Sequence, residues 1–288
     1  ISENPDAKWI TGRGWQYTFY ASGMPDHESM KSIKTDKPIF IRAYDGHSAW
    51  ANHAALKLAG ITRNTRFTGF GEVVFDASGE PTGALKESAM DLVGKLIPPP
   101  TREEKLNALR KGLAYAASLG ITSAQNASGS AEELSLYLEL LRNNELTLRY
   151  AAAFSAGEET TKNHIENFTR LKDSIGFNNR MLRADAIKFM IDGVIESHTG
   201  AMLGKYDDLQ EKDPLATGQL ALSLERYNEL VTEFDARGFR IYTHAIGDKG
   251  VRESLNAYEH ASNENQTRDA RHRVEHIETI SPDDFPRF

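Results

Sequence analysis

The feature that most constrains the fold is a regular alternation of helical and strand patterns from about residue 101 onward. Five short runs of strand-forming residues are separated by segments whose apolar residues recur at helical spacing. The runs span residues 121–127, 146–154, 184–192, 239–247 and 271–278. This alternation predicts a parallel sheet with right-handed helical crossovers. Open doubly wound sheets and closed (β/α)8 barrels both show it, and five strands suffice for the first but fall short of the second.

The segments between these runs carry signals for the start and end of helices. Thr101 is followed three places later by Glu104, which is a capping-box pattern, and Gly120 is a suitable helix C-cap. The predicted helices span residues 101–120, 130–145, 160–175, 223–238 and 248–263.

The first hundred residues differ from the rest because they are rich in loops and turns. The sequence "DASGEPTG" at residues 76–83 predicts a hairpin turn between short strands, and residues 49–60 predict a helix. We expect residues 1–100 to form an excursion that packs on a sheet domain of residues 101–288. The proline-rich stretch 97–101 is the expected boundary.

Composition disfavours several classes of function. The 288 residues carry a net charge of −7 and no tract dense in lysine and arginine, which disfavours nucleic acid and anionic membranes as partners. No apolar run reaches membrane-spanning length. The absence of cysteine excludes disulfides and thiolate metal sites. Because it fits cytoplasmic and exported proteins alike, the compartment stays open.

Both ends of the sequence favour an internal fragment of a longer protein. The chain starts at Ile1, with no methionine and no signal-like segment before it. It ends with residues 278–288, which resemble the opening of a helix, because Ser281 is a suitable N-cap and Pro282 suits the first helical position. The sequence stops at Phe288, soon after this expected helix begins.

Polar side chains gather at the ends of the last three predicted strands. They are Lys188 and Asp192, His244 and Asp248, and Glu275, His276 and Glu278. Chemistry collects at the carboxyl ends of parallel strands in α/β folds. Lys188 stands among apolar residues, where an ammonium group needs a partner or must change its charge. If carbon dioxide carboxylated its amine, Lys188 would become an anionic ligand that, with histidine, suits zinc or a similar divalent ion.

Each of these residues also has an ordinary structural interpretation. A histidine near a strand end is commonly a hydrogen-bonded core residue, and a strand lysine is commonly ion-paired or reaches solvent with its amine. No local motif such as H-E-x-x-H is present, so a metal site and structural histidines both stay open. In the first hundred residues, His47 stands between Gly46 and Ser48, where a side chain can project. Glu87 follows a turn at the start of a helix, where a carboxylate is electrostatically favoured.

Seven stretches of the sequence, in this order, resemble the amidohydrolase family 3 group. They are "WITGRGW", "DKPIFIRAYDGHSAWANHAALKLAGI", "GEPTGALKESA", "LGITSAQNA", "AIKFMIDG", "IYTHAIGDKGV" and "RHRVEHIETISPDD". The resemblance covers essentially the whole chain. The group includes N-substituted formamide deformylase and YtcJ-like metal-dependent hydrolases, and some relatives carry the label exoenzyme regulatory protein.

The resemblance implies an α/β fold, the metal-dependent TIM (β/α)8 barrel of the amidohydrolase superfamily. The family's first strand carries a His-x-His metal motif that this sequence lacks, and its last catalytic strand carries an aspartate that lies outside this sequence. The five predicted strands would therefore be barrel strands two to six. The first hundred residues would be the long excursion that follows strand one.

Carried over by position, three residues resemble the family's metal ligands. Lys188 resembles the strand-four lysine that bridges two metals once it is carboxylated. His244 and His276 resemble the ligands of strands five and six. Asp192 lies on the same strand face as Lys188 by two-residue alternation, so it is the rival carboxylate.

Three further residues are implied to lie near the substrate or its binding groups. Asp45 and His47 match the "DGH" of the family, which is expected near the substrate. His198 stands where the family commonly has the arginine of an Arg-Thr-Ala pattern, which leaves recognition of a substrate anion open. Together with Asp192, these residues are the catalytic candidates.

The resemblance implies hydrolysis of an amide-type, non-peptide C–N bond in a small molecule. One or two divalent ions, expected to be zinc, would activate water, and the aspartate outside this sequence would shuttle the proton. The chain itself is then expected to be an inactive piece that self-associates through exposed strand edges. The alternatives are a non-enzymatic regulatory or binding protein on the same scaffold, and a self-contained α/β domain with structural histidines.

Overall fold

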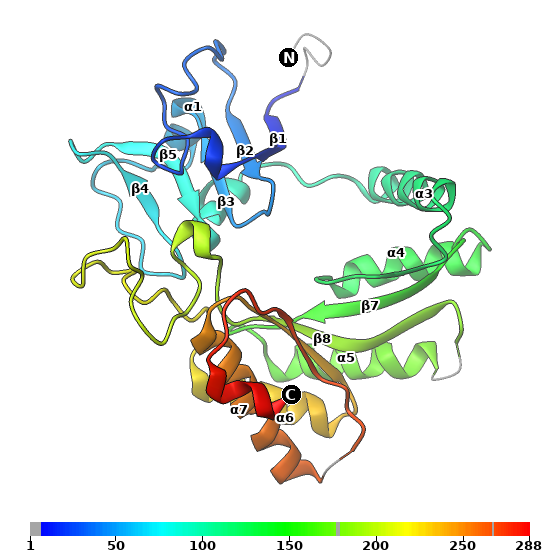
Figure 1. Cartoon of the computed structure of the whole chain (residues 1–288). Coiled ribbons are helices and arrows are strands. Elements are labelled where there is room, and N and C mark those ends of the chain that lie inside the picture. The colour runs from blue at the N-terminus through cyan, green and yellow to red at the C-terminus, as the bar shows by residue number, and fades with distance from the viewer. Residues whose placement is uncertain (1–6, 177–178, 267) are drawn as a thin grey trace. The chain divides into compact units, whose positions relative to one another are not determined.

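The computed structural model describes residues 7–176, 179–266 and 268–288. Figure 1 shows the chain, which divides into two compact units. Unit 1 contains Ile1–Pro99 and Gly193–Leu220, and unit 2 contains Pro100–Asp192 and Ala221–Phe288. Residues 193–220 therefore group with unit 1, although they lie in the range expected for the sheet domain. None of the helices described here is long and apolar enough to cross a membrane.

Unit 1 is built on a five-stranded mixed sheet with the strand order β1-β2-β3-β5-β4. β1 and β2 are parallel, and the other neighbouring strands are antiparallel. Its elements are β1 (Ile10–Trp15), η1 (Tyr17–Phe19), β2 (Ile39–Ala43), β3 (Ser48–Ala51), α1 (His53–Leu58), β4 (Val73–Phe75), β5 (Pro81–Lys86), η2 (Glu87–Met90), α2 (Asp91–Gly94) and η3 (Ile195–Ser197).

The predicted hairpin between β4 and β5 is present. Asp76 Oδ1 accepts the backbone N–H groups of Ser78 and Glu80 at 2.8 and 2.9 Å. Gly79 adopts a left-handed conformation with φ +80°, which glycine tolerates without steric cost. This turn chemistry fixes the antiparallel pairing of β4 with β5.

The helix predicted for residues 49–60 is wrong in its first part. Ala49 and Trp50 lie in β3 and pair with both β2 and β5. The helix α1 begins only after Asn52, whose side chain accepts the backbone N–H of Ala55 as an N-cap. All four residues of β3 are buried, so the strand has no polar face and lacks the alternation by which a half-buried strand is recognised.

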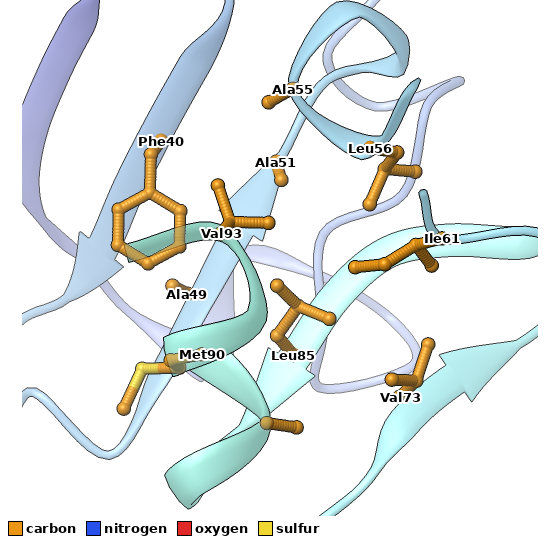
Figure 2. Close-up of a cluster of buried hydrophobic side chains, with 11 residues drawn as sticks. Phe40, Ala49, Ala51, Ala55, Leu56, Ile61, Val73, Leu85, Met90 and Val93 are labelled. Atoms are coloured by element: carbon orange, nitrogen blue, oxygen red, sulfur yellow. The ribbon is translucent and has the colours of Figure 1, made fainter. Parts of the chain in front are cut away.

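The core of unit 1 lies between the sheet and the short helices α1 and α2 (Figure 2). The buried cluster consists of Phe40, Ala49, Ala51, Ala55, Leu56, Ile61, Val73, Leu85, Ala89, Met90 and Val93. Burial of each Val, Leu, Ile, Phe or Met side chain stabilises the fold by about 1.5–3 kcal/mol. The cluster thus joins β2, β3, β4, β5 and both helices into one body.

Unit 2 contains a five-stranded, wholly parallel sheet in the order β10-β9-β8-β7-β6, and the predicted strands and crossover helices are confirmed. Its elements are α3 (Arg102–Ser118), β6 (Ser123–Gln125), α4 (Ala131–Arg142), β7 (Arg149–Ser155), α5 (Lys162–Ile175), β8 (Leu182–Met190), α6 (Leu224–Ala236), β9 (Arg240–Ala245), α7 (Asp248–Asn265), β10 (Arg273–His276) and η4 (Pro282–Arg287). Thr101 and Glu104 form the predicted capping box at the start of α3. The end of the chain forms the 3-10 helix η4, and Ser281 makes no side-chain cap hydrogen bond there.

The parallel sheet of unit 2 is curled into a half-barrel. Its edge strands are β6 and β10, and a flat sheet of five strands would hold them about 19 Å apart. Arg273 Nη1 on β10 nevertheless donates to Gln125 Oε1 on β6 at 3.0 Å. The two side chains therefore meet across the concave face, because the curl of the sheet brings its edge strands closer together.

The two faces of this sheet have different chemistry. Phe154 and Phe189 lie on the convex face, where their rings contact Phe168 of α5 and Tyr227 of α6. The concave face begins with a small buried cluster of Ala153, Ala186 and Tyr242. Because side chains alternate along a strand and paired residues share a face, the next inward positions belong to Lys188 and His244.

Candidate metal centre and catalytic residues

The register of three neighbouring strands brings the polar residues of unit 2 together. Lys188 of β8 pairs with Tyr242 of β9, two residues before His244. Glu275 of β10 pairs directly with His244. Lys188 and His244 are 4% and 3% exposed, so both side chains are enclosed in the concave face of the half-barrel.

Lys188 is ion-paired with Glu275, whose carboxylate also accepts a hydrogen bond from Arg273 Nε at 2.9 Å. Burial lowers the pKa of Lys188, although the carboxylate of Glu275 acts in the opposite direction. For Glu275, burial favours a higher pKa, but the hydrogen bonds and charges of Lys188 and Arg273 outweigh it and lower the pKa. The structure therefore joins Lys188 and Glu275 in an enclosed ion pair.

His244 and His276 lie against each other at the end of β9 and β10. Their ring centroids are 4.6 Å apart and the ring planes meet at 63°. Regular alternation would put His276 on the opposite face from Glu275, because these residues are adjacent in the strand. His276 instead has φ +79° and Ile277 φ +53°, so the chain turns where β10 ends. The left-handed backbone of His276 and Ile277, which is uncommon, therefore occurs where the imidazole of His276 lies beside that of His244.

Asp192 follows β8 and is fully buried. Its carboxylate accepts the backbone N–H groups of Ile246 and Gly247 at 3.0 and 2.9 Å, at the start of α7. His244 Nε2 lies 3.7 Å from Asp192 Oδ1. A carboxylate in this position is favoured by the helix N-terminus, and it fixes the junction that follows His244.

The donors of unit 2 fit a metal ion in part. Within residues 7–176, 179–266 and 268–288, no group of three or more His, Cys, Asp or Glu side chains is arranged to hold a metal. The two neighbouring imidazoles of His244 and His276 are suitable nitrogen donors. Lys188 would complete a set of three protein donors only after carboxylation, because an ammonium group has no lone pair to offer.

In unit 1, Asp45 shapes the backbone that presents His47. Asp45 Oδ1 accepts the backbone N–H of His47 at 3.0 Å, and the Tyr17 hydroxyl donates to Asp45 Oδ2 at the same distance. Burial raises the pKa of Tyr17, so its hydroxyl keeps the proton that it donates. Asp45 is thereby held by side chain and backbone at once, two residues before the histidine.

The ring of His47 meets two residues that sequence reasoning did not connect with it. His47 Nδ1 lies 3.0 Å from Glu87 Oε2 and 3.2 Å from Glu87 Oε1. Thr199 Oγ1 donates to Glu87 Oε1 at 2.9 Å. Glu87 carried only the signal of a carboxylate at a helix start, and nothing in the sequence linked it to a threonine more than a hundred residues away.

His198 lies in unit 1, in the segment 193–220. Its backbone is left-handed with φ +57°, and its Nε2 is 2.9 Å from Asp208 Oδ2. Its ring makes an edge contact with Tyr206, at 5.0 Å between centroids. The hydrogen bond from His198 lowers the pKa of Asp208. His198 is thus engaged by residues of its own segment.

Comparison with known proteins identifies the family. The model of the amidohydrolase family matches residues 2–288. The chain belongs to the amidohydrolase family. This confirms the resemblance carried by the sequence motifs.

Similar proteins support this assignment and the fold. The chain is 29% identical to "Protein LONG AFTER FAR-RED 3" of Arabidopsis thaliana, over all of the chain and 50% of that protein. It is 28% identical to the putative amidohydrolase YtcJ of Bacillus subtilis, over 88% of the chain and 47% of YtcJ. The crystal structure of an uncharacterized metal-dependent hydrolase from Pyrococcus horikoshii has the same fold, with a TM-score of 0.63 and 24% identity over 98% of this chain and 52% of that one. The chain thus spans about half the length of these proteins.

Proposed function

We propose that this chain is part of a metal-dependent hydrolase that cleaves a non-peptide C–N bond in a small molecule. Membership of the amidohydrolase family supports this function, as does the similarity to a putative amidohydrolase. The observation that carries the proposal is the pair of imidazoles, His244 and His276, at the carboxyl ends of adjacent parallel strands. That end of a parallel sheet is where α/β enzymes place their chemistry.

We further propose that the half-barrel corresponds to strands two to six of a TIM barrel. Five parallel strands with helical crossovers and an inward curl support this numbering. On this numbering, β8, β9 and β10 are barrel strands four, five and six. Lys188, His244 and His276 then occupy the positions at which the family resemblance expects metal ligands.

In this proposal, His244, His276 and a carboxylated Lys188 would hold a divalent ion, with zinc as the expected metal and one or two ions in the site. A divalent ion supplies a water of lowered pKa and polarises a carbonyl. Carbon dioxide reacts with a neutral amine, so Lys188 would have to leave its ion pair with Glu275 and lose a proton before carboxylation. Asp192 would keep the end of β9 in place through the backbone of Ile246 and Gly247.

Turnover of small amides tests the function directly. The protein in its longest natural form should hydrolyse members of a panel of N-formyl and N-acyl amides, lose activity on chelation and regain it with zinc. His244→Ala should abolish turnover, whereas His260→Ala, at an exposed position of α7, should not. Activity that survives both chelation and His244→Ala would contradict the proposal. Metal binding without turnover of any amide would favour a regulatory or binding protein.

We also propose that the 288-residue chain associates with itself. Within the part of the chain that the structure describes, β6 and β10 each have a strand neighbour on one side. Unpaired parallel edges are templates for pairing with another chain. Light scattering should show oligomers whose proportion grows with concentration, and a monomer at all concentrations would contradict this.

A further inference from the structure

The polar cluster around Glu87 joins three segments of unit 1 that are distant in sequence. His47 precedes β3, Glu87 begins η2, and Thr199 follows η3. The side chains of His47 and Glu87 are 12% and 6% exposed, and Thr199 is fully buried. An enclosed carboxylate must have its acceptor positions satisfied by protein groups, because water is largely excluded. The partners of Glu87 therefore determine how the histidine ring is held.

The backbone at Glu87 is strained. Its φ of +50° lies in the left-handed region, which is uncommon for residues other than glycine and asparagine. Neighbouring backbone holds this conformation, because the Glu87 N–H donates to the His47 carbonyl at 2.8 Å. A Cβ placed on Gly71 would lie 2.3 Å from the Lys86 carbonyl oxygen, so the chain passes very close to this position. Strain that the surroundings maintain is characteristic of functional positions.

The proton positions in the cluster follow from which groups can donate. An ionised carboxylate only accepts hydrogen bonds, so the Thr199 hydroxyl donates to Glu87 Oε1. For the same reason His47 Nδ1 must carry the proton in its contact with the carboxylate. In the neutral ring the other nitrogen, Nε2, then has a lone pair and acts as an acceptor.

We propose that Glu87, held by Thr199, is a positioning residue that fixes His47 in the Nδ1–H tautomer and so makes Nε2 the hydrogen-bond acceptor of the ring. In the proposed hydrolase, an acceptor at this position would suit a hydrogen-bond donor such as an amide N–H or a water molecule. Asp45 and the Glu87 N–H both hold the backbone of His47, and the carboxylate of Glu87 acts on the ring. The link to a substrate rests on the proposed hydrolase function, whereas the tautomer is a property of this chain alone.

The tautomer can be read from the nitrogen chemical shifts of His47 in the ¹⁵N-labelled chain, assigned with a His47→Gln variant. The wild-type chain should show a protonated Nδ1 and an unprotonated Nε2. Glu87→Gln keeps the shape of the side chain. Because Thr199 donates to one end of the amide, the amide oxygen should stay there and the NH2 group should face His47 Nδ1. The proton of His47 should then move to Nε2.

A second substitution should reverse this change. In the double variant Glu87→Gln with Thr199→Val, no hydroxyl holds the amide oxygen, so the amide can turn its oxygen to His47 and restore the Nδ1–H tautomer. A merely structural role of Thr199 would not produce this rescue. Glu80→Gln is the matched control, because Glu80 forms an exposed ion pair with Arg63 in the same unit. It should leave the His47 shifts unchanged.

Turnover by the longest natural form extends the test to the ligand. Glu87→Gln should lower kcat about 10- to 100-fold with little change in KM, by analogy with the range found when hydrogen-bond partners of metal-bound histidines are replaced. An Nε2–H tautomer in the wild-type chain, or identical His47 shifts in wild type and Glu87→Gln, would overturn the inference. If the wild-type protein hydrolyses no amide, the proposed function fails, while the NMR result still decides the role of Glu87.

Discussion

The two units hold their candidate residues by different means. In unit 2, the register of β8, β9 and β10 places Lys188, His244 and Glu275, and an ion pair neutralises the buried lysine. In unit 1, the ring of His47 is held by Glu87 and Thr199, which stand on irregular segments. The placement of the candidate residues therefore depends on charge balance within a regular sheet in unit 2. In unit 1 it depends on the path of the backbone. Substitutions that disturb one or the other should distinguish the two arrangements.

The largest loss of stability is expected where an added side chain would clash with the backbone of unit 1. Gly83 has φ +95°, and a Cβ there would lie 2.4 Å from the Ala51 carbonyl oxygen and 2.7 Å from Trp50 Nε1. Gly83→Ala should destabilise unit 1 by about 3–4 kcal/mol, because a left-handed alanine and an overpacked contact add their costs. Native-state hydrogen exchange of β3 and β5 amides measures this loss.

Gly112→Ala is a control substitution with the opposite expected effect on stability. Gly112 lies inside α3, and nothing is within 4 Å of a Cβ placed there. The substitution should stabilise α3 by about 1 kcal/mol, because alanine is the better helix former. Equal protection of β3 and β5 in wild type and Gly83→Ala would show that unit 1 does not depend on this backbone path.

A smaller loss is expected where charge balance is broken in unit 2. Glu275→Ala should destabilise the half-barrel by about 2–3 kcal/mol, because it leaves the ammonium group of Lys188 enclosed without its partner. The double variant Lys188→Met with Glu275→Leu should recover most of this loss, because neither charge remains buried. Exchange of β8 and β9 amides, with Glu264→Ala at an exposed site of α7 as control, measures both.

A double variant as unstable as Glu275→Ala would contradict this view of unit 2. It would mean that packing around the two side chains, and not their charge, holds the concave face. The contrast with unit 1 would then disappear, since both regions would depend on shape.

The smallest expected effect is a pH dependence of the stability of unit 2. His272 Nδ1 accepts the Ile241 N–H at 3.0 Å, and Nε2 lies 3.0 Å from Asp235 Oδ1. Burial lowers the pKa of His272, although the charge of Asp235 opposes this. The folded chain thus resists protonation of His272 more than the unfolded chain does. The stability that neutral His272 contributes is fully present above its unfolded-state pKa of about 6.5. It falls as the pH drops from that value toward the folded-state pKa, by at most about 1.4 kcal/mol per pH unit.

The contribution of His272 is isolated by comparing wild type with His272→Gln. The difference in protection of β9 amides between pH 7.5 and pH 5 should be smaller in the variant. If both proteins lose the same protection, His272 is not the group that titrates.

Regular periodicity explains which parts of the structure could be predicted from sequence. Five parallel strands were predicted from their alternation with helices, and the capping box of Thr101 from its spacing to Glu104. The nearness of Lys188 and His244 followed from their positions at the ends of neighbouring strands. These features depend on residues that are close in sequence or related by strand register.

Contacts between irregular segments could not be predicted in this way. The Glu87–Thr199 hydrogen bond joins residues separated by a long stretch of chain, and the left-handed backbone of Glu87 has no glycine or asparagine to signal it. The residues of β3 carry no strand alternation in the sequence, because both faces of the strand are buried. The pairing of Lys188 with Glu275 required the observed register of β9 and β10 as well as the strand pattern.

Metal content of the longest natural form tests the central claim most directly. The protein, purified after incubation with zinc and bicarbonate and then desalted, should retain stoichiometric metal by elemental analysis. His276→Ala should lower the metal content about tenfold or more, because one of two neighbouring imidazole donors is lost, whereas His260→Ala should leave it unchanged. Wild-type metal content in His276→Ala, or no metal in the wild-type protein, would contradict a metal centre at the ends of β9 and β10.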